Sequence, residues 1–240
     1  MRNGEEAAHM LQDETIARNR GQVGLHSQDD GTSFEEFLVA YDGQHAEWFP
    51  DGRVEVQMAA SEQHQSILIF LLSLLNLYLS LRQIGRVLIA PFVMKTHDDL
   101  PAREPDLMII LNANLDRIQP TRLAGPADIA IEIVSVESVE RDYGAKFAEY
   151  EAAGVQEYWL LDPIRQAARV HELVMLNDRA VYQVRPLDPQ GRLTSGLLPG
   201  FALDPRLMWQ DAPPTGMALI ALAGEMTGLA LARRDESTES

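Results

Sequence analysis

Two near-continuous apolar runs constrain the fold of this chain more than any other feature of its sequence. Residues 106–111 (DLMIIL) and 128–135 (DIAIEIVS) each follow a proline closely and carry few polar groups. A strand exposed on one face alternates polar and apolar residues, whereas a strand buried on both faces is apolar almost throughout. The two runs therefore predict inner strands of a sheet that helices cover on both sides.

The longest apolar stretch, residues 67–81, has the composition of a helix buried in a core. Its 15 residues are fewer than the roughly 20 that a membrane-spanning helix needs. The polar residues within and just before it recur at spacings of seven, three and four, which places them on one thin helical stripe. We therefore expect a buried helix and no membrane partner.

The remaining patterns complete an alternation of helices and strands. Ser33 is an N-cap candidate for a short helix that ends near Tyr41, and residues 137–153 have helical spacing up to Gly154, a helix-ending residue. Strands are expected at residues 53–58, 86–94 (interrupted at Pro91), 157–161, 169–174 and 180–185. This order predicts an α/β fold with a mixed central β-sheet flanked by helices.

A single domain over residues 32–211 accounts for this alternation, since no repeat or low-complexity linker divides it. Residues 1–31 carry six acids and few large apolar groups, so we expect a disordered or loosely structured extension. Residues 212–240 predict a C-terminal helix and a polar tail. The first residues lack the apolar segment of a secretory signal, so we expect a cytoplasmic location.

Charge and cysteine content exclude several classes of site. The chain has 36 acidic and 20 basic residues, and its net charge of −16 argues against non-specific coating of DNA or membrane surfaces. It has no cysteine, which excludes disulfides, thiol catalysis and cysteine-ligated metal sites. Metal ligands would therefore be carboxylates or histidine, a set that favours magnesium or manganese.

Glu132 lies where a buried strand should carry no charge. A period of two places it on one strand face with Asp128 and Ala130, and places the isoleucines on the other face. A lone buried carboxylate is costly, so Glu132 needs a metal, a cation or a wet cleft, and pairing with an arginine is the alternative. Asp128 lies about 13 Å away along the strand, too far to share one ion, and is better explained as a turn residue.

Asp106, at the start of the other apolar run, is the candidate partner of Glu132. Two acids on adjacent strands can meet at one Mg²⁺, with water and phosphate completing the octahedron. Such an arrangement is typical of phosphoryl transfer.

These residues also carry a family resemblance. Pro105-Asp106 followed by Glu132-Ile133-Val134, on two strands and before a helix, resembles the core of the PD-(D/E)XK nucleases. The run GPADIAIEIVSVESVERDYGAKFAEYEAAGVQEYWLLDP more specifically resembles the Uma-type (Uma two) family, a bacterial family of restriction endonuclease-like proteins. The similarity extends from SFEEFLVAYDGQHAEWFPDGRVEV to SGLLPGFAL, which is about 170 residues.

The resemblance implies a restriction-endonuclease-like core and an endonuclease, a hydrolase of phosphodiester bonds. Carried over by position, Asp106 and Glu132 bind Mg²⁺ or Mn²⁺. Glu47 and His64 take the family's upstream positions and line the same cleft, although each could be an ordinary surface residue. The implied partner is nucleic acid, DNA in the first instance, and a homodimer is expected if both strands of a duplex are cut.

The lysine of the superfamily pattern is displaced in this chain. Val134 stands two residues after Glu132, and the looser family pattern places the lysine in the following helix, at Lys146. An ammonium there would orient the attacking water if the helix packs over the strand ends. Lys146 is one of only two lysines among the 20 basic residues. The alternative is a solvated Lys146 paired with Asp142.

A second function stays open at this point: a catalytically inactive nuclease-fold protein that acts as a binding or assembly module. The net charge of −16 favours it, because nucleic-acid binding needs local positive charge. The sequence has no helix-turn-helix, zinc module or basic arm that would set a recognition sequence.

Overall fold

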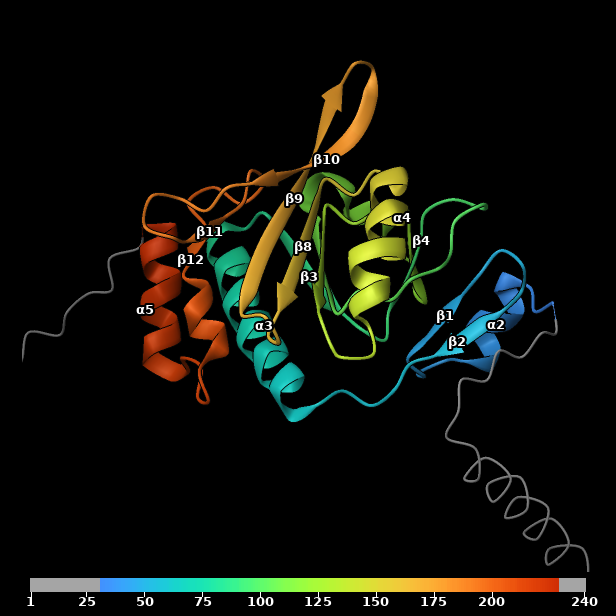
Figure 1. Cartoon of the computed structure of the whole chain (residues 1–240), viewed down its shortest axis with the longest axis horizontal. Coiled ribbons are helices and arrows are strands. Elements are labelled where there is room, and N and C mark those ends of the chain that lie inside the picture. The colour runs from blue at the N-terminus through green and yellow to red at the C-terminus, as the bar shows by residue number, and fades with distance from the viewer. Residues whose placement is uncertain (1–30, 229–240) are drawn as a thin grey trace, which may run out of the picture.

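The computed structural model describes residues 31–228, and a six-stranded mixed sheet lies at its centre (Figure 1). The strand order is β10-β9-β8-β7-β5-β3. The strands are β3 (Gly85–Ile89), β5 (Leu107–Leu111), β7 (Ile129–Ile133), β8 (Glu157–Asp162), β9 (Ala167–Leu176) and β10 (Arg179–Arg185). The β7–β8 pair is parallel and the other pairs are antiparallel. The predicted α/β fold with a mixed sheet is confirmed.

Helices cover both faces of this sheet, as the apolar runs predicted. The helices α3 (Glu62–Arg82) and α5 (Gly216–Thr227) lie on one face and α4 (Lys146–Ala153) on the other (Figure 1). Side chains such as Ile131 belong to the core beneath α3, whereas Ala130 belongs to the core beneath α4. Because strand residues alternate, Glu132 points toward α4.

The helix α3 is the buried helix predicted from the longest apolar stretch. Among residues 31–228 it is the one helix long and apolar enough to span a membrane by length and composition. Its side chains pack on the sheet, however, and Leu71 and Leu74 are completely buried. Ser61 caps its start by accepting a hydrogen bond from the His64 amide at 3.2 Å.

The helix predicted near the C-terminus is α5, which packs against α3. It adds Ala223 and Met226 to the core that α3 shares with the sheet. At the other end of the chain, the predicted N-terminal extension lies almost wholly outside the described residues.

A small unit of one helix and one hairpin flanks the sheet beside α4 (Figure 1). It consists of α2 (Phe34–Ala40), β1 (Ala46–Trp48) and β2 (Val54–Val56), packed around Phe37 and Trp48. The predicted N-cap is confirmed, because Ser33 and Glu36 form a reciprocal capping box.

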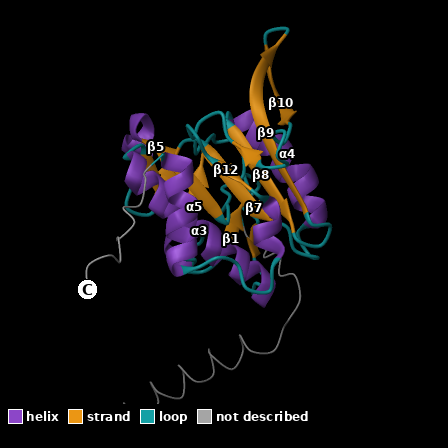
Figure 2. Ribbon diagram, turned by 90° about the vertical axis from the view of Figure 1, so that its left-hand side faces the viewer, coloured by secondary structure: helices purple, strands orange, loops and turns teal. Residues whose placement is uncertain are grey.

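Shorter elements connect these parts. The expected strand at residues 86–94 is divided at cis-Pro91 into β3 and β4 (Val93–Lys95), and β4 pairs in parallel with β6 (Arg122–Ala124). The hairpin of β9 and β10, also predicted, projects beyond the sheet (Figure 2). The other short elements are β11 (Leu193–Thr194), β12 (Ala202–Leu203), two 3₁₀-helices (Asn112–Arg117 and Pro205–Trp209) and a π-helical turn (Arg141–Ala145).

Candidate active site

The helix after β7 contains a π-helical turn at Arg141–Ala145 and continues as α4. The Lys146 amide donates to the carbonyl of Arg141, five residues back, so this turn holds one more residue than an α-helical turn. Asp142, Lys146 and Tyr150 are spaced by four residues and are all buried beneath the helix. The helix therefore packs this stripe against the sheet, as the position of Lys146 requires.

The ammonium of Lys146 lies among three carboxylates. Its Nζ is 2.8 Å from Glu132 Oε1, 3.4 Å from Glu47 Oε1 and 3.6 Å from Asp142 Oδ1. Burial would lower the pKa of Lys146, but the carboxylates of Glu132, Glu47 and Asp142 raise it well above its usual value. Lys146 is only 4% exposed, so the alternative of a solvated lysine is wrong. Its side chain is a fixed positive charge.

Glu132 is held by two donors from the helix above it. Its Oε1 accepts hydrogen bonds from Lys146 Nζ and from the Tyr150 hydroxyl, the latter at 2.7 Å. Burial raises the pKa of Glu132 to about 8; Lys146 opposes this shift, and the carboxylates of Asp142 and Asp106 add to it. The other oxygen, Oε2, accepts no hydrogen bond from any residue of the described range.

Asp106 lies beside Glu132 on the neighbouring strand. The register of β5 and β7 pairs Leu107 with Ile131, and one further step places Asp106 opposite Glu132. The Ile133 amide donates to Asp106 Oδ2 at 2.7 Å. Asp106 is therefore fixed by the backbone of the strand that carries Glu132.

His64, in the first turn of α3, contacts the same oxygen of Asp106. Its Nε2 is 3.2 Å from Oδ2, and the side chain is largely buried. Burial lowers the pKa of His64, but the hydrogen bond and the charge of Asp106 outweigh it, so the net shift is upward. The predicted His64 thus lies in the cluster and holds Asp106 from the side of α3.

Glu47, on β1, closes the cluster. Its Oε2 is 2.5 Å from Arg103 Nη1, and Gln57 Nε2 donates to the same oxygen at 3.2 Å. Arg103 also forks onto Glu149 of α4, at 2.7 and 2.9 Å. Burial would raise the pKa of Glu47, but Lys146 and Arg103 lower it to about 2. Glu47 is therefore an ionised, immobilised neighbour of Lys146.

The structure brings all five predicted site residues together, and it places Asp128 elsewhere. Asp128 accepts hydrogen bonds from the Leu111 amide and from the Asn114 side chain, both at 2.7 Å. The turn role predicted for Asp128 is confirmed.

Two residues of the cluster were missed by the sequence analysis. Tyr150 had a usable signal, because it continues the four-residue spacing of Asp142 and Lys146 on one helix face. Arg103 had none, because its partners Glu47 and Glu149 are 56 and 46 residues away in the sequence.

The donor set suits a hard divalent cation. Asp106 Oδ1 and Glu132 Oε2 have no donor within the described part of the chain, and the buried atoms Asp142 Oδ1 and Glu47 Oε1 accept no hydrogen bond. Within that same part, no three His, Asp or Glu side chains converge on one point to form a metal site by themselves. Mg²⁺ commonly binds through one or two carboxylates and keeps several waters, so these residues fit it.

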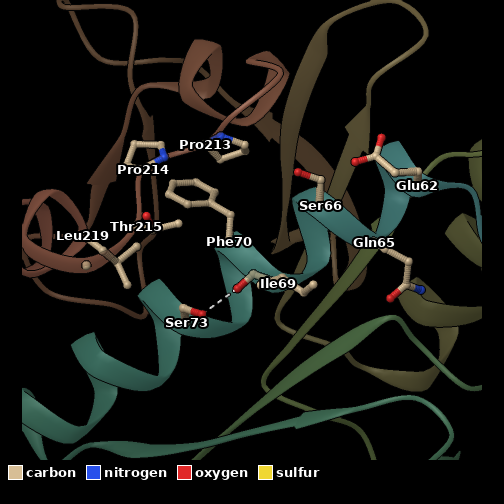
Figure 3. Close-up of a pocket in the computed structure, with 11 residues that line it drawn as sticks. Glu62, Gln65, Ser66, Ile69, Phe70, Ser73, Pro213, Pro214, Thr215 and Leu219 are labelled. Atoms are coloured by element: carbon tan, nitrogen blue, oxygen red, sulfur yellow. Dashed lines mark hydrogen bonds between the residues drawn. The ribbon is translucent and has the colours of Figure 1, made fainter.

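An apolar groove of about 410 Å³ lies apart from this cluster (Figure 3). It runs between α3, which contributes Ile69 and Phe70, and the segment from Pro213 to Leu219. The groove belongs to a different part of the surface, because it is lined by no residue of the acidic cluster, which consists of Glu47, His64, Asp106, Glu132, Asp142 and Lys146.

A family model named Uma2, with the description "Putative restriction endonuclease", matches residues 34–206. The chain belongs to the Uma2 family. The matched range contains every residue of the acidic cluster, and the family predicted from the central motif is confirmed.

Among solved structures, the Uma2 chain resembles one titled as a putative nuclease belonging to DUF820 from Anabaena variabilis ATCC 29413. The two are 18% identical with a TM-score of 0.52, over 68% of this chain and 89% of that one. At this identity the likeness establishes a shared fold, and it leaves the residue roles as predictions. Among curated proteins, none matches the chain.

Proposed function

We propose that this Uma2 chain is a metal-dependent endonuclease that hydrolyses the phosphodiester bonds of nucleic acid, DNA in the first instance. The observation that carries the proposal is the buried 2.8 Å contact between Lys146 Nζ and Glu132 Oε1, beside Asp106 on the adjoining strand. The family description and the nuclease fold of the solved relative support it.

Asp106 and Glu132 would hold Mg²⁺ or Mn²⁺ through their oxygens that lack a donor. A bound ion would supply Lewis-acid polarisation of the scissile phosphate and a lowered pKa of bound water. Oxygen ligands on two strands of a packed sheet suit such an ion, since their separation is fixed by backbone pairing.

Lys146 acts in this proposal as a charge and a donor, and not as a base. Its raised pKa keeps the ammonium protonated at neutral pH. One proton is donated to Glu132, and the others can meet an attacking water or a phosphate oxygen on which negative charge develops. Glu47 and Asp142 hold the ammonium in this place.

His64 is a positioning residue for Asp106. Its Nε2 lies 3.2 Å from Oδ2, which also accepts a hydrogen bond from the Ile133 amide, and Oδ1 is left without a donor among the described residues. A cytoplasmic location, and a homodimer for double-strand cutting, are further predictions of the same proposal.

Cleavage of supercoiled plasmid in Mg²⁺ or Mn²⁺ tests the proposal. The wild-type protein should produce nicked or linear DNA, and Asp106→Asn and Glu132→Gln should each slow this at least about 100-fold. Asp128→Asn is the matched control, because it neutralises an acid of the same strand region that lies in a turn. Cleavage that survives both site substitutions would refute the proposal.

The alternative is a catalytically inactive nuclease-fold protein that binds or assembles. The net charge of −16 is the observation in its favour. Wild-type protein that neither cleaves nucleic acid nor binds Mn²⁺ in calorimetry would establish it over the nuclease.

A further inference from the structure

Arg141 differs from the other arginine at the acidic cluster in having no carboxylate partner. Within residues 31–228, Arg103 is paired with Glu47 and Glu149, whereas Arg141 forms no ion pair. Arg141 occupies the first position of the π-helical turn, next to Asp142. No acid of the described chain therefore forms an ion pair with Arg141, although its charge acts to lower the pKa values of Glu47 and Asp142.

The guanidinium of Arg141 is nevertheless held in place. Its Nη2 donates to Gln57 Oε1 at 2.7 Å, and Gln57 in turn donates to Glu47. Its Nε is buried and has no acceptor. The side chain as a whole is partly exposed, so part of it faces solvent at the edge of the cluster.

A fixed guanidinium with free N–H groups has the geometry of a phosphate ligand. Arginine presents five donors in a planar fork, and a phosphate can accept from two of them at once. Gln57 uses one nitrogen, which leaves Nε and the other terminal nitrogen. A buried N–H without an acceptor is unfavourable, and an anionic oxygen would relieve that state.

We propose that Arg141 binds a backbone phosphate of the nucleic-acid substrate, at or beside the scissile bond. The inference rests on the proposed nuclease function and names the residue that supplies local positive charge to an acidic protein. Gln57 links the guanidinium to Glu47, and Glu47 contacts Lys146. Two hydrogen bonds and one ion pair therefore connect the phosphate-binding guanidinium to the acidic cluster.

The salt dependence of binding tests this inference. Fluorescein-labelled DNA and RNA duplexes of one sequence would be titrated with Glu132→Gln protein, so that binding is measured without cleavage. Each phosphate contact contributes about 0.9 to the slope of log K against log salt concentration on B-DNA. Adding Arg141→Gln should weaken binding of the preferred duplex about tenfold and reduce its slope by about 0.9.

Two further variants separate a phosphate contact from a structural role. Arg179→Gln removes the same charge at the exposed start of β10, where no ion pair forms within the described chain, and should leave the slope unchanged. Arg141→Lys keeps the charge and loses the fork, so it should keep most of the slope while affinity falls.

The results for the two proteins test separate claims: phosphate binding by Arg141 and the proposed nuclease function. A wild-type slope in the Arg141→Gln protein overturns the inference, even if affinity falls with a lowered melting temperature. Failure of the Glu132→Gln protein to bind either duplex would instead count against the proposed function itself.

Discussion

The ammonium of Lys146 lies 2.8 Å from the carboxylate of Glu132, although the two residues come from α4 and β7. The superfamily pattern would place this lysine on the strand, where the chain has Val134, and Val134 is buried in the core beneath α4. The lysine instead reaches the acid from the helix that covers the strand. Core packing fixes the positions of β7 and α4. The ammonium of Lys146 therefore lies beside Glu132 although Lys146 is not on the strand.

Lys146→Met should destabilise the protein by about 3–5 kcal/mol. The substitution leaves Glu132, Glu47 and Asp142 buried without their shared cation, and breaking one partner of a buried ion pair has that cost. Urea unfolding monitored by circular dichroism measures the loss.

A second substitution distinguishes this cause from lost packing. Glu132→Gln added to Lys146→Met should restore more than about 1 kcal/mol, because it removes a carboxyl group that without Lys146 stays buried either uncompensated or at the cost of taking up a proton. Additive free-energy changes in the two single variants and the double variant would show that the contact contributes nothing.

Tyr150→Phe should weaken metal binding about tenfold. The variant removes the 2.7 Å hydrogen bond to Glu132 Oε1, and groups that orient metal-binding carboxylates have effects of this size. Calorimetric titration with Mn²⁺ measures the affinity. Tyr182→Phe is the control, since it removes a 2.9 Å hydrogen bond to the Val155 carbonyl away from the cluster. Equal Mn²⁺ affinities in the two variants would argue against a role for Tyr150.

His171 should make stability depend on pH below about 6.5. His171 lies on β9 and packs among Phe147, Tyr158 and Tyr182. Burial together with the charge of Arg169 lowers its pKa. The unfolded chain therefore takes up a proton first as the pH falls below about 6.5. The free energy of unfolding should decrease until the pH reaches the folded-state pKa, and then level off.

His171→Gln removes this titration, so its stability should fall less between about pH 7 and about pH 5. Urea unfolding at several pH values compares the two slopes. Parallel curves for the variant and the wild-type protein would show that His171 has the same pKa folded and unfolded.

The main elements of the fold could be predicted because each carries a local signal. The apolar runs of β5 and β7 and the left-handed Gly154 at the end of α4 are features of this kind. Other strands escape prediction because they have only two or three residues, too few to show a period: β1, β6, β11 and β12. Their positions are set by pairing with distant segments.

The candidate site was predictable only in part. Glu132 stood out as an acid in an apolar strand, and the family resemblance pointed to Lys146. The buried-acid signal alone is ambiguous, since Glu157 is equally hidden yet accepts hydrogen bonds from Trp159, Ser195 and Gly196 that tie down a loop. The π-helical turn that sets the position of Lys146 has no pattern in the sequence.

The position of Mn²⁺ in crystals of the protein tests the central claim most directly. Anomalous scattering at the manganese edge should give a peak between Asp106 Oδ1 and Glu132 Oε2, with Lys146 close by and unliganded. A peak bound to neither carboxylate, in crystals of protein that cleaves plasmid in Mn²⁺, would contradict the assignment of the metal site.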